Sequence, residues 1–443
     1  MLMKNESTIV AISTPVGTGG ISIIRMSGSD ALKIAKKVFK SKKELSPRQM
    51  VLGEISTQNF NEKCMCVYFK EPNSFTGEDM VEFQCHGGVS LTNGVLNELL
   101  EQGATLATNG EFSKRAFLNG KLNLSQAEGM IDMINAESEA EIRAGYELLK
   151  GHLAEQVQKL QDELKDLIAE IEVSFDYPEN DYEDVTKVKA EKVLKDINNQ
   201  IKSLLKTSTT GKVIKDGVNV LIIGEPNVGK SSLLNALLNE NKAIVTSTAG
   251  TTRDVIEGKY LYKGVKFNLI DTAGIHETND EIESIGIEKA KQFIDSADII
   301  LHIIDSSIVN NQNTEIIKLL KNKTYYTIKN KIDCGDKNKS IKGIEISAKT
   351  KKGIEELKEF LYTRIFEENI NQNGIMLTNQ RHIESLKKSQ NYIENALKNI
   401  DFVPLDVLSV DINASWQALG EITGQTSSED IIDTIFSKFC LGK

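Results

Sequence analysis

The stretch GEPNVGKSS, residues 224–232, follows the apolar run VNVLII (218–223) and leads into LLNALL (233–238). Its two glycines, Gly224 and Gly229, are separated by four residues, and Lys-Ser follows the second. This is the phosphate-loop pattern, in which glycine lets the backbone turn tightly so that its N–H groups point at phosphates. The stretch therefore predicts a buried strand, a phosphate-binding loop and a helix.

Two side chains of this loop have predicted chemical roles. We expect Lys230 to reach the β- and γ-phosphates of a bound nucleotide, and the Ser231 hydroxyl to ligate Mg²⁺. The helix that begins here adds the positive end of its dipole. A chance glycine-rich turn is the alternative, but the flanking strand and helix favour a phosphate loop. The predicted contacts are Asn227, Val228, Gly229, Lys230, Ser231 and Ser232.

The motif DTAG (271–274) follows the strand-like run KFNLI (266–270). We expect Asp271 to hold Mg²⁺ through water and the Gly274 N–H to contact the γ-phosphate. The predicted nucleotide contacts here are Asp271, Thr272, Ala273 and Gly274.

Between these motifs lies TAGTTRD (248–254), which is rich in glycine and threonine. Either Thr251 or Thr252 could close on Mg²⁺ when a γ-phosphate is present, and we favour Thr252. Such a segment orders with GTP and relaxes after hydrolysis, although a plain polar loop is the alternative. The predicted contacts here are Thr246, Ser247, Thr248, Ala249, Gly250, Thr251 and Thr252.

The motif NKID (330–333) selects the base. Asp333 can accept two hydrogen bonds from the N1–H and amino group of guanine, a donor pair that adenine lacks. ISAK (346–349) follows another strand and is expected to contact the guanine oxygen through backbone N–H groups near Ala348. The predicted contacts are Asn330, Lys331, Asp333, Ser347, Ala348 and Lys349. These motifs in this order predict a GTP site on a doubly wound sheet.

Hydrolysis needs a group to orient water, and many GTPases use a glutamine directly after DTAG. Here Ile275 occupies that position and cannot do so. An acidic segment, HETNDEIESIG (276–286), follows and offers the carboxylates Glu277, Asp280, Glu281 and Glu283. A solvated acidic loop is the alternative for any one of them.

Hydrolysis also needs a positive charge near the transferred phosphate. Arg253 is one candidate, although it lies beside Asp254. A monovalent cation is the other, with oxygen ligands from Asn227, Thr246 and carbonyls near Thr248.

The rest of the chain surrounds this α/β domain with other patterns. Residues 1–118 mix short strands and helices, which predicts an α+β domain. Residues 124–177 are long, charged and periodic, and predict two long helices, with Ser125 and Glu128 as a capping box. Because the termini of a domain usually lie close together, we expect the helices on either side of the α/β domain to form one discontinuous domain. The predicted domains are 1–118 (α+β), 119–212 (helical, first part), 213–372 (α/β P-loop GTPase, inserted) and 373–443 (helical, second part).

The composition is that of a globular protein, with 443 residues, 40% hydrophobic and 26% charged. The five cysteines are scattered, which predicts ordinary thiols rather than disulfides. No apolar run is long enough for a bilayer and no signal peptide is evident, so a cytoplasmic protein without membrane contact is expected. The net charge of −10 indicates that, if the chain serves RNA, a partner supplies much of the phosphate-binding surface.

The order of the nucleotide motifs looks like that of translation-associated GTPases of the Era and EngA groups. Further stretches narrow the resemblance: TPVGTGGISIIRMSG (14–28), GEDMVEFQCHGG (77–88), FLNGKLNLSQAEGMIDMINA (117–136) and FCLGK (439–443). With these, essentially the whole chain resembles the MnmE (TrmE) family of tRNA modification GTPases.

The resemblance implies a GTPase that, with an FAD-dependent partner, installs a 5-carboxymethylaminomethyl or aminomethyl group on the wobble uridine of certain tRNAs. It implies a homodimer formed through a folate-binding-like N-terminal domain, and a heterotetramer with the partner. That domain would bind a 5-formyl-tetrahydrofolate derivative as one-carbon donor, and Arg25, Glu82, Lys121 and Lys443 match its contact positions.

The resemblance also assigns the ions. K⁺ would replace an arginine finger at Asn227, Thr246, Thr248 and Thr251, whereas Mg²⁺ would bind Ser231 and Thr252. Glu283 matches the carboxylate that positions water. Cys440, in FCLGK, is a candidate catalytic residue, with a small packed hydrophobe as the alternative.

Two other functions compete with this one. An Era- or EngA-like ribosome-assembly switch would carry an RNA-binding domain with a GXXG loop or a second GTPase domain. This chain has one phosphate loop and ends in helices and FCLGK, which disfavours that function. A purely structural scaffold is the third possibility, and K⁺-stimulated turnover would count against it.

Overall fold

The computed structural model describes residues 7–176, 180–238, 258–271, 292–309, 314–321, 323–366 and 375–443. Contacts divide the chain into two compact units. The first unit comprises Met1–Ile131, Gly145–Ile201 and Glu384–Lys443, and the second comprises Asp132–Ala144 and Lys202–Ile383. The domain boundaries in the sequence analysis remain predictions.

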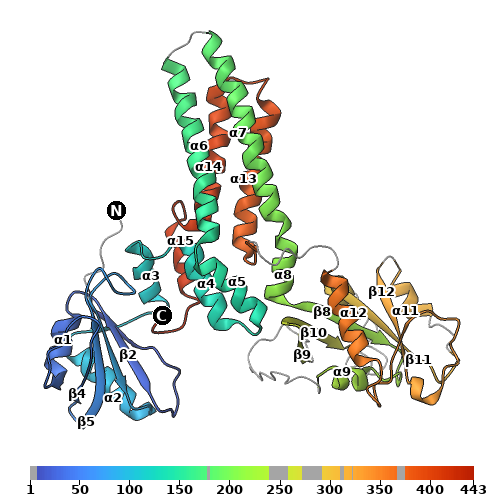
Figure 1. The fold of residues 1–443 in the computed structure, drawn as a ribbon, viewed down its shortest axis with the longest axis horizontal. Helices are drawn as coiled ribbons and strands as arrows, with labels where there is room; N and C mark the ends of the chain where they lie inside the picture. Colours follow the sequence, from blue (N-terminus) through green and yellow to red (C-terminus); the bar gives the residue numbers. More distant parts are fainter. Residues whose placement is uncertain are drawn as a thin grey trace, which may run out of the picture. The chain divides into compact units, whose positions relative to one another are not determined.

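The first unit contains a seven-stranded sheet in the order β3-β4-β5-β6-β2-β1-β7. Its strands are β1 (Ile9–Ile12), β2 (Ser22–Ser27), β3 (Phe39–Ser41), β4 (Met50–Ser56), β5 (Asn61–Phe69), β6 (Met80–Cys85) and β7 (Thr105–Leu106). Two helices, α1 (Ala31–Val38) and α2 (Val89–Glu101), pack on this sheet (Figure 1) and close a core that includes Ile24, Phe83 and Leu99. The predicted α+β fold is therefore confirmed.

Three cysteines, Cys64, Cys66 and Cys85, lie buried in this core. All five cysteines of the chain are among the described residues and are free. Burial raises the pKa of the Cys66 thiol, so this group stays neutral and behaves as a small apolar side chain.

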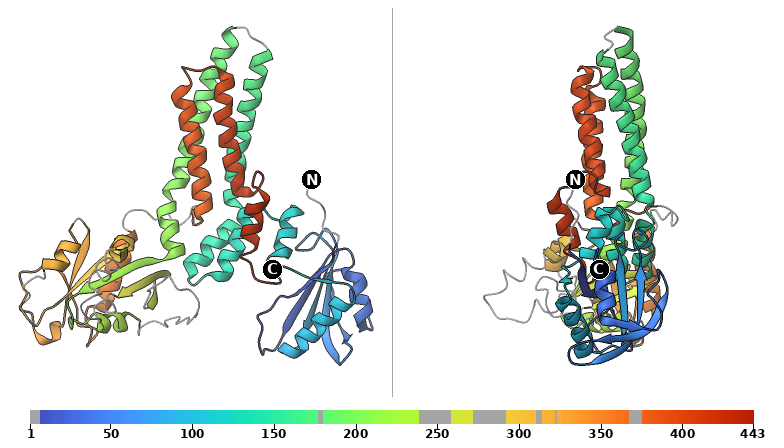
Figure 2. Two further views of the ribbon diagram at one scale, coloured as in Figure 1. Left: turned by 180° about the vertical axis from the view of Figure 1, so that it is seen from behind. Right: turned by 90° about the vertical axis from the view of Figure 1, so that its left-hand side faces the viewer.

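The helices before and after the α/β domain, beyond α1 and α2, are α3 (Glu111–Leu118), α4 (Leu124–Asn135), α5 (Glu139–Leu149), α6 (His152–Asp176), α7 (Asn180–Lys206), α8 (Ser208–Asp216), α13 (Gln380–Asn399), α14 (Leu405–Thr423) and α15 (Glu429–Phe436). Helix α14 packs along α6, so segments on either side of the α/β domain form one bundle (Figure 2). The discontinuous helical architecture is confirmed.

The helices over 124–177 differ from the prediction in number and in their start. The structure has three helices rather than two, because the chain breaks before Glu139 and at Gly151, whose φ of +89° is left-handed. The capping box at the start of α4 is formed by Asn123 and Gln126, two residues before the predicted pair. Asn123 Oδ1 accepts from the Gln126 N–H at 2.9 Å, and Gln126 Oε1 accepts from the Asn123 N–H at 3.0 Å. The predicted pair Ser125 and Glu128 lies inside the helix.

The second unit contains a six-stranded sheet in the order β13-β12-β11-β8-β10-β9. Its elements are β8 (Val218–Gly224), α9 (Lys230–Leu238), β9 (Gly258–Tyr262), β10 (Val265–Asp271), β11 (Ile299–Asp305), α11 (Thr314–Leu319), β12 (Tyr325–Asn330), a 3₁₀ turn (Ile332–Cys334), β13 (Ile344–Glu345) and α12 (Ile354–Phe366). All neighbouring strands are parallel except the β9–β10 hairpin.

Both faces of this sheet are covered, which explains why its central strands are mainly apolar. On β8, Val220 and Ile222 join a core cluster with residues of α9 and α12, whereas Leu221 and Ile223 join another with residues of α11. The predicted doubly wound sheet is therefore present. Among the residues that the structure describes, no helix is both long and apolar enough to span a membrane.

Candidate functional site

The carboxyl ends of the parallel strands bring the nucleotide motifs to one edge of the second sheet. Strand β8 ends at Gly224, β10 at Asp271, β11 at Asp305 and β12 at Asn330. The register places Asp271 opposite Ile222 on β8, and Asp305 opposite Asn330. In an open α/β sheet this edge is where ligands bind.

The phosphate loop has the backbone conformation that its glycine pattern predicts. Gly229 has φ +99°, and a Cβ at this position would lie 2.3 Å from Asn330 Nδ2. The buried Lys230 directs its ammonium to the carbonyl oxygens of Gly224 and Glu225, each at 3.0 Å. Lys230 therefore lies over its own loop, and Ser231 and Ser232 follow in the first turn of α9.

Asn330 joins the phosphate loop to the base-binding segment. This side chain is buried and satisfies both of its polar ends: Nδ2 donates to Val228 O at 2.9 Å, and Oδ1 accepts from the Ala348 N–H at 3.0 Å. Its role is therefore to hold two loops together, which its place in the NKID motif does not reveal.

Lys331 makes a second connection to the same loop. Its Nζ donates to Asn227 O at 2.8 Å and to Asp305 Oδ2 at 2.7 Å. Burial alone would raise the pKa of Asp305, but hydrogen bonds from Lys331 and Ser307 lower it. Sequence reasoning missed Asp305, although its position as the last residue of an apolar strand is a signal that could have found it.

Asp333 is exposed, and both of its carboxylate oxygens accept hydrogen bonds, Oδ2 from Cys334 Sγ at 3.5 Å. Its Oδ1 accepts from Ser347 Oγ at 2.6 Å, which links NKID to ISAK, and this bond is the main cause of the lowered pKa of Asp333. An ionised carboxylate only accepts hydrogen bonds, and it can therefore pair with the N1–H and amino donors of guanine.

Many predicted contacts lie outside the described residues. They are Thr246, Ser247, Thr248, Ala249, Gly250, Thr251, Thr252, Thr272, Ala273, Gly274 and Glu283. Within the described part of the site, the Ser231 hydroxyl is a hard oxygen ligand of the kind that Mg²⁺ takes together with phosphate oxygens.

A second group of predicted residues meets in the first unit. Arg25 on β2 lies opposite Glu82 on β6, and Arg25 Nε donates to Glu82 Oε1 at 2.8 Å. The Arg25 guanidinium carbon is 5.8 Å from the ring centroids of both Phe75 and Phe112. Sequence reasoning missed these two aromatic residues.

The C-terminal segment reaches this group. Gly442 O accepts from Arg25 Nη1 at 3.4 Å and from Ser13 Oγ at 3.2 Å. Gly442 has φ +84°, and a Cβ there would lie 2.4 Å from Ile12 O. The tail that carries Lys443 is therefore packed closely against β1.

The other two candidates are Lys121 and Cys440. The alkyl chain of Lys121 approaches Gly77, where a Cβ would be 3.1 Å from Lys121 Cε, in the loop that also carries Phe75. Cys440 is an exposed free thiol, and its carbonyl accepts from the Gly110 N–H at 3.5 Å. The exposed thiol does not behave as a packed hydrophobe.

The doubly wound sheet, the glycine-dependent loop and the Asn330 and Asp333 contacts define the chain as a P-loop protein of the GTPase class. A family model described as the MnmE helical domain matches residues 124–440, and one described as the N-terminus of the GTP-binding protein TrmE matches residues 8–121. The chain belongs to the MnmE family of tRNA modification GTPases.

Curated relatives agree with this assignment. The tRNA modification GTPase MnmE of Clostridioides difficile (strain 630) is 40% identical over 99% of this chain and 99% of its own. That of Alkaliphilus metalliredigens (strain QYMF) is 41% identical over the same shares. Among solved structures, a variant of Aquifex aeolicus Era bound to GDP.AlF4⁻ is 28% identical and covers 39% of this chain and 66% of that one, with a TM-score of 0.27.

Proposed function

We propose that this GTPase hydrolyses GTP to GDP and phosphate in order to modify the wobble uridine of certain tRNAs. With an FAD-dependent partner, it installs a 5-carboxymethylaminomethyl or aminomethyl group. The one-carbon unit comes from a 5-formyl-tetrahydrofolate derivative. The observation that carries the proposal is the identity of about 40% to MnmE tRNA modification GTPases over 99% of the chain.

In the proposed nucleotide site, loop N–H groups and Lys230 bind the phosphates and Asp333 selects guanine. The bond from Ser347 Oγ, 2.6 Å long, supports this role because it orients the Asp333 carboxylate. Ser231 and Thr252, with Asp271 acting through water, would hold Mg²⁺, which would supply positive charge to the phosphates. The remaining proposed contacts are those of the motifs around Asn227, Thr248, Gly274 and Lys349.

The proposed hydrolytic groups are Glu283, which positions water, and K⁺, which takes the place of an arginine finger. The K⁺ ligands are Asn227, Thr246, Thr248 and Thr251. Ile275 after DTAG supports the Glu283 assignment, because an isoleucine side chain has no group to orient water.

The proposed donor site lies around Arg25, Glu82, Lys121 and Lys443. Its chemistry suits a folate: Glu82 can accept hydrogen bonds from a pterin, cationic groups attract the glutamate tail, and Phe75 and Phe112 offer flat apolar faces. Cys440 is proposed as a catalytic thiol at this site, because it is exposed and its backbone adjoins Gly442.

We also propose a homodimer through the N-terminal domain and a heterotetramer with the FAD-dependent partner, in the cytoplasm. The net charge of −10 supports a need for a partner, because an acidic chain alone repels the tRNA backbone.

The experiment is nucleoside mass spectrometry of tRNA from cells that lack the gene. We expect the modified wobble uridine to be absent, to return with the wild-type chain, and to remain absent with Lys230→Ala or Arg25→Ala variants. A normal level of the modified nucleoside in the deletion strain would overturn the proposal.

A further inference from the structure

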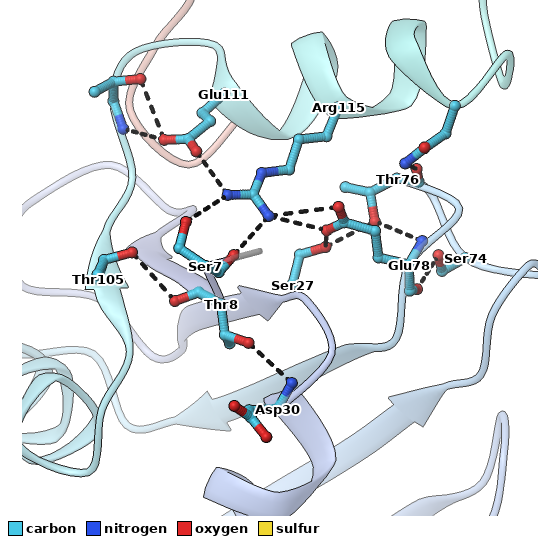
Figure 3. Close-up of polar contacts among 12 residues, drawn as sticks. Ser7, Thr8, Ser27, Asp30, Ser74, Thr76, Glu78, Thr105, Glu111 and Arg115 are labelled. Atoms are coloured by element: carbon cyan, nitrogen blue, oxygen red, sulfur yellow. Dashed lines mark hydrogen bonds and ion pairs between the residues drawn. The ribbon is translucent and has the colours of Figure 1, made fainter. Parts of the chain in front are cut away.

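A buried arginine outside the proposed contact residues links separate segments of the first unit (Figure 3). Arg115 lies on α3, and only 3% of its side chain is exposed. Its guanidinium donates to Ser7 O at 2.8 Å and to Glu111 Oε1 at 2.8 Å, and it pairs with Glu78 Oε2 at 3.2 Å. Two carboxylates and a carbonyl thus share one cation.

The Glu78 end of this ion pair holds the loop between β5 and β6. Ser27 Oγ donates to Glu78 Oε2 at 2.8 Å and lies 2.7 Å from Thr76 Oγ1. Because the single hydroxyl hydrogen of Ser27 is used by Glu78, Thr76 is the donor to Ser27. Asn119 Nδ2 donates to Thr76 O at 2.8 Å, so the loop is fixed from β2 and from the end of α3.

The Arg115 network is expected to fix the arrangement of its segments more than it adds to the stability of the folded protein. A buried guanidinium stays charged and must be paired, and apolar side chains of similar size often stabilise a protein as well as a buried ion pair does. What an ion pair of this kind adds is a fixed arrangement of the segments that supply its partners.

Those segments are the walls of the Arg25 site. Phe75 lies in the loop that Thr76 and Glu78 fix, and Phe112 follows Glu111 on α3. Both rings approach the Arg25 guanidinium, and the Lys121 chain lies against Gly77 in the same loop. Lys121 follows α3, and its N–H donates to Ala116 O at 2.8 Å. A shift of this loop away from α3 would therefore move Phe75 relative to Arg25 and separate Gly77 from the Lys121 chain.

We infer that Arg115 is a positioning residue for the folate site, and that its pair with Glu78 sets the loop 74–78 over Arg25. The inference rests on the proposed function of that site. Arg115 itself is enclosed by protein groups and does not touch the ligand.

The test compares two neutralised carboxylates that both contact Arg115. Glu78→Gln weakens the tie to the loop, whereas Glu111→Gln removes charge at an i,i+4 partner on α3 itself and leaves the loop contacts intact. Calorimetry of the full chain with 5-formyl-tetrahydrofolate measures affinity, and melting temperature and GTP affinity report on the fold. We expect roughly a tenfold loss of folate affinity for Glu78→Gln and less than about twofold for Glu111→Gln.

Ser27→Ala provides a second variant if Glu78→Gln folds poorly, because it removes the hydroxyl bridge without changing charge. We expect it to weaken folate binding roughly threefold at unchanged GTP affinity. Equal losses in the Glu78 and Glu111 variants, or wild-type folate affinity in both Glu78→Gln and Ser27→Ala, would overturn the inference.

Arg25→Ala separates this outcome from failure of the proposed function. If Arg25→Ala abolishes folate binding while Glu78→Gln and Ser27→Ala do not weaken it, only the positioning role is wrong. If Arg25→Ala binds folate as the wild type does, the proposed folate site itself is wrong.

Discussion

At the scale of single residues, Gly229 determines whether the phosphate loop can close against Asn330. An alanine there would combine a left-handed backbone with a Cβ 2.3 Å from Asn330 Nδ2. We expect Gly229→Ala to lower GTP affinity roughly tenfold or more, as measured by titration with a fluorescent GTP analogue.

Gly264 offers a matched control, because it has φ +80° and no heavy atom within 4 Å of an added Cβ. Gly264→Ala should lower the free energy of unfolding by about 1–2 kcal/mol, the cost of placing alanine in a left-handed conformation, and should bind GTP normally. Equal effects of the two variants on GTP affinity would show that the approach to Asn330 is unimportant.

Gly442 makes the corresponding prediction for the second site. A Cβ at 2.4 Å from Ile12 O would push the tail away from β1 and from Arg25. Gly442→Ala is expected to reduce 5-formyl-tetrahydrofolate affinity roughly tenfold in calorimetry, with GTP affinity unchanged. Full retention of folate binding would mean that the docked tail is not part of that site.

The nucleotide motifs were predictable from sequence, because each is a short contiguous stretch that directly follows a strand, as around Lys230 and Asp333. The contacts of Asn330 with Val228 and Ala348 were not, nor was the Asp305–Lys331 pair. These join residues that are separated in sequence, and the parallel pairing of β8, β11, β12 and β13 brings them together.

At the scale of elements, the β9–β10 hairpin lies in the chain between two predicted nucleotide-sensing segments, TAGTTRD (248–254) and DTAG (271–274). An acidic residue between α4 and α5 binds this hairpin: Glu137 accepts from Lys266 Nζ at 3.0 Å and from Lys259 Nζ at 3.2 Å. Lys266 is also 3.3 Å from Glu141 Oε1. The hairpin is therefore tied to the start of α5 by charge.

These contacts make stability depend on pH. Burial alone would raise the pKa of Glu137, but hydrogen bonds from Lys266 and Lys259 lower it below its usual 4.5. A carboxyl whose pKa is lower in the folded state than in the unfolded state stabilises the folded protein at pH values above the unfolded-state pKa. That stabilisation is lost as the pH falls through the folded-state pKa.

We expect Glu137→Gln to be less stable than the wild type by about 1 kcal/mol at pH 7, a modest value because solvent screens a partly exposed pair. The difference should shrink as pH falls below 4.5, since the wild-type carboxyl then also becomes neutral. Urea denaturation of both proteins at several pH values measures this. A difference independent of pH would contradict a charge-based tie.

Helix content was predictable from periodicity, but helix number was not. The break before Glu139 lies within a stretch that keeps a helical pattern, and Asn123 caps α4 where Ser125 gave an equally good capping signal. When two capping residues lie two positions apart, packing decides which of them caps the helix, and the amino-acid sequence alone does not show that packing.

At the scale of the whole molecule, the inserted GTPase domain was predictable because helices resume after it. Which of the flanking helices pair was not predictable, since the α6–α14 contact joins residues far apart in sequence. The buried Arg115 network was equally hidden, because an arginine in a short charged helix usually lies at the surface.

The proposed K⁺ site predicts a property of the complete protein. GTP turnover should be roughly tenfold or more faster in KCl than in NaCl at equal ionic strength, because a cation would then stabilise charge on the transferred phosphate. Phosphate release under both salts measures this, with Asn227→Ala as the variant that should abolish the difference. Equal turnover in both salts would exclude K⁺ from hydrolysis.

Guanine recognition by the Asp333 carboxylate is tested most directly by calorimetry of the purified chain with GTP, ATP and XTP. We expect GTP to bind the wild type roughly 100-fold more tightly than ATP, because adenine leaves the carboxylate without its donors. In Asp333→Asn the preference should move from GTP to XTP. ATP binding as tight as GTP binding, or an unchanged base preference in the variant, would contradict a GTPase built on this site.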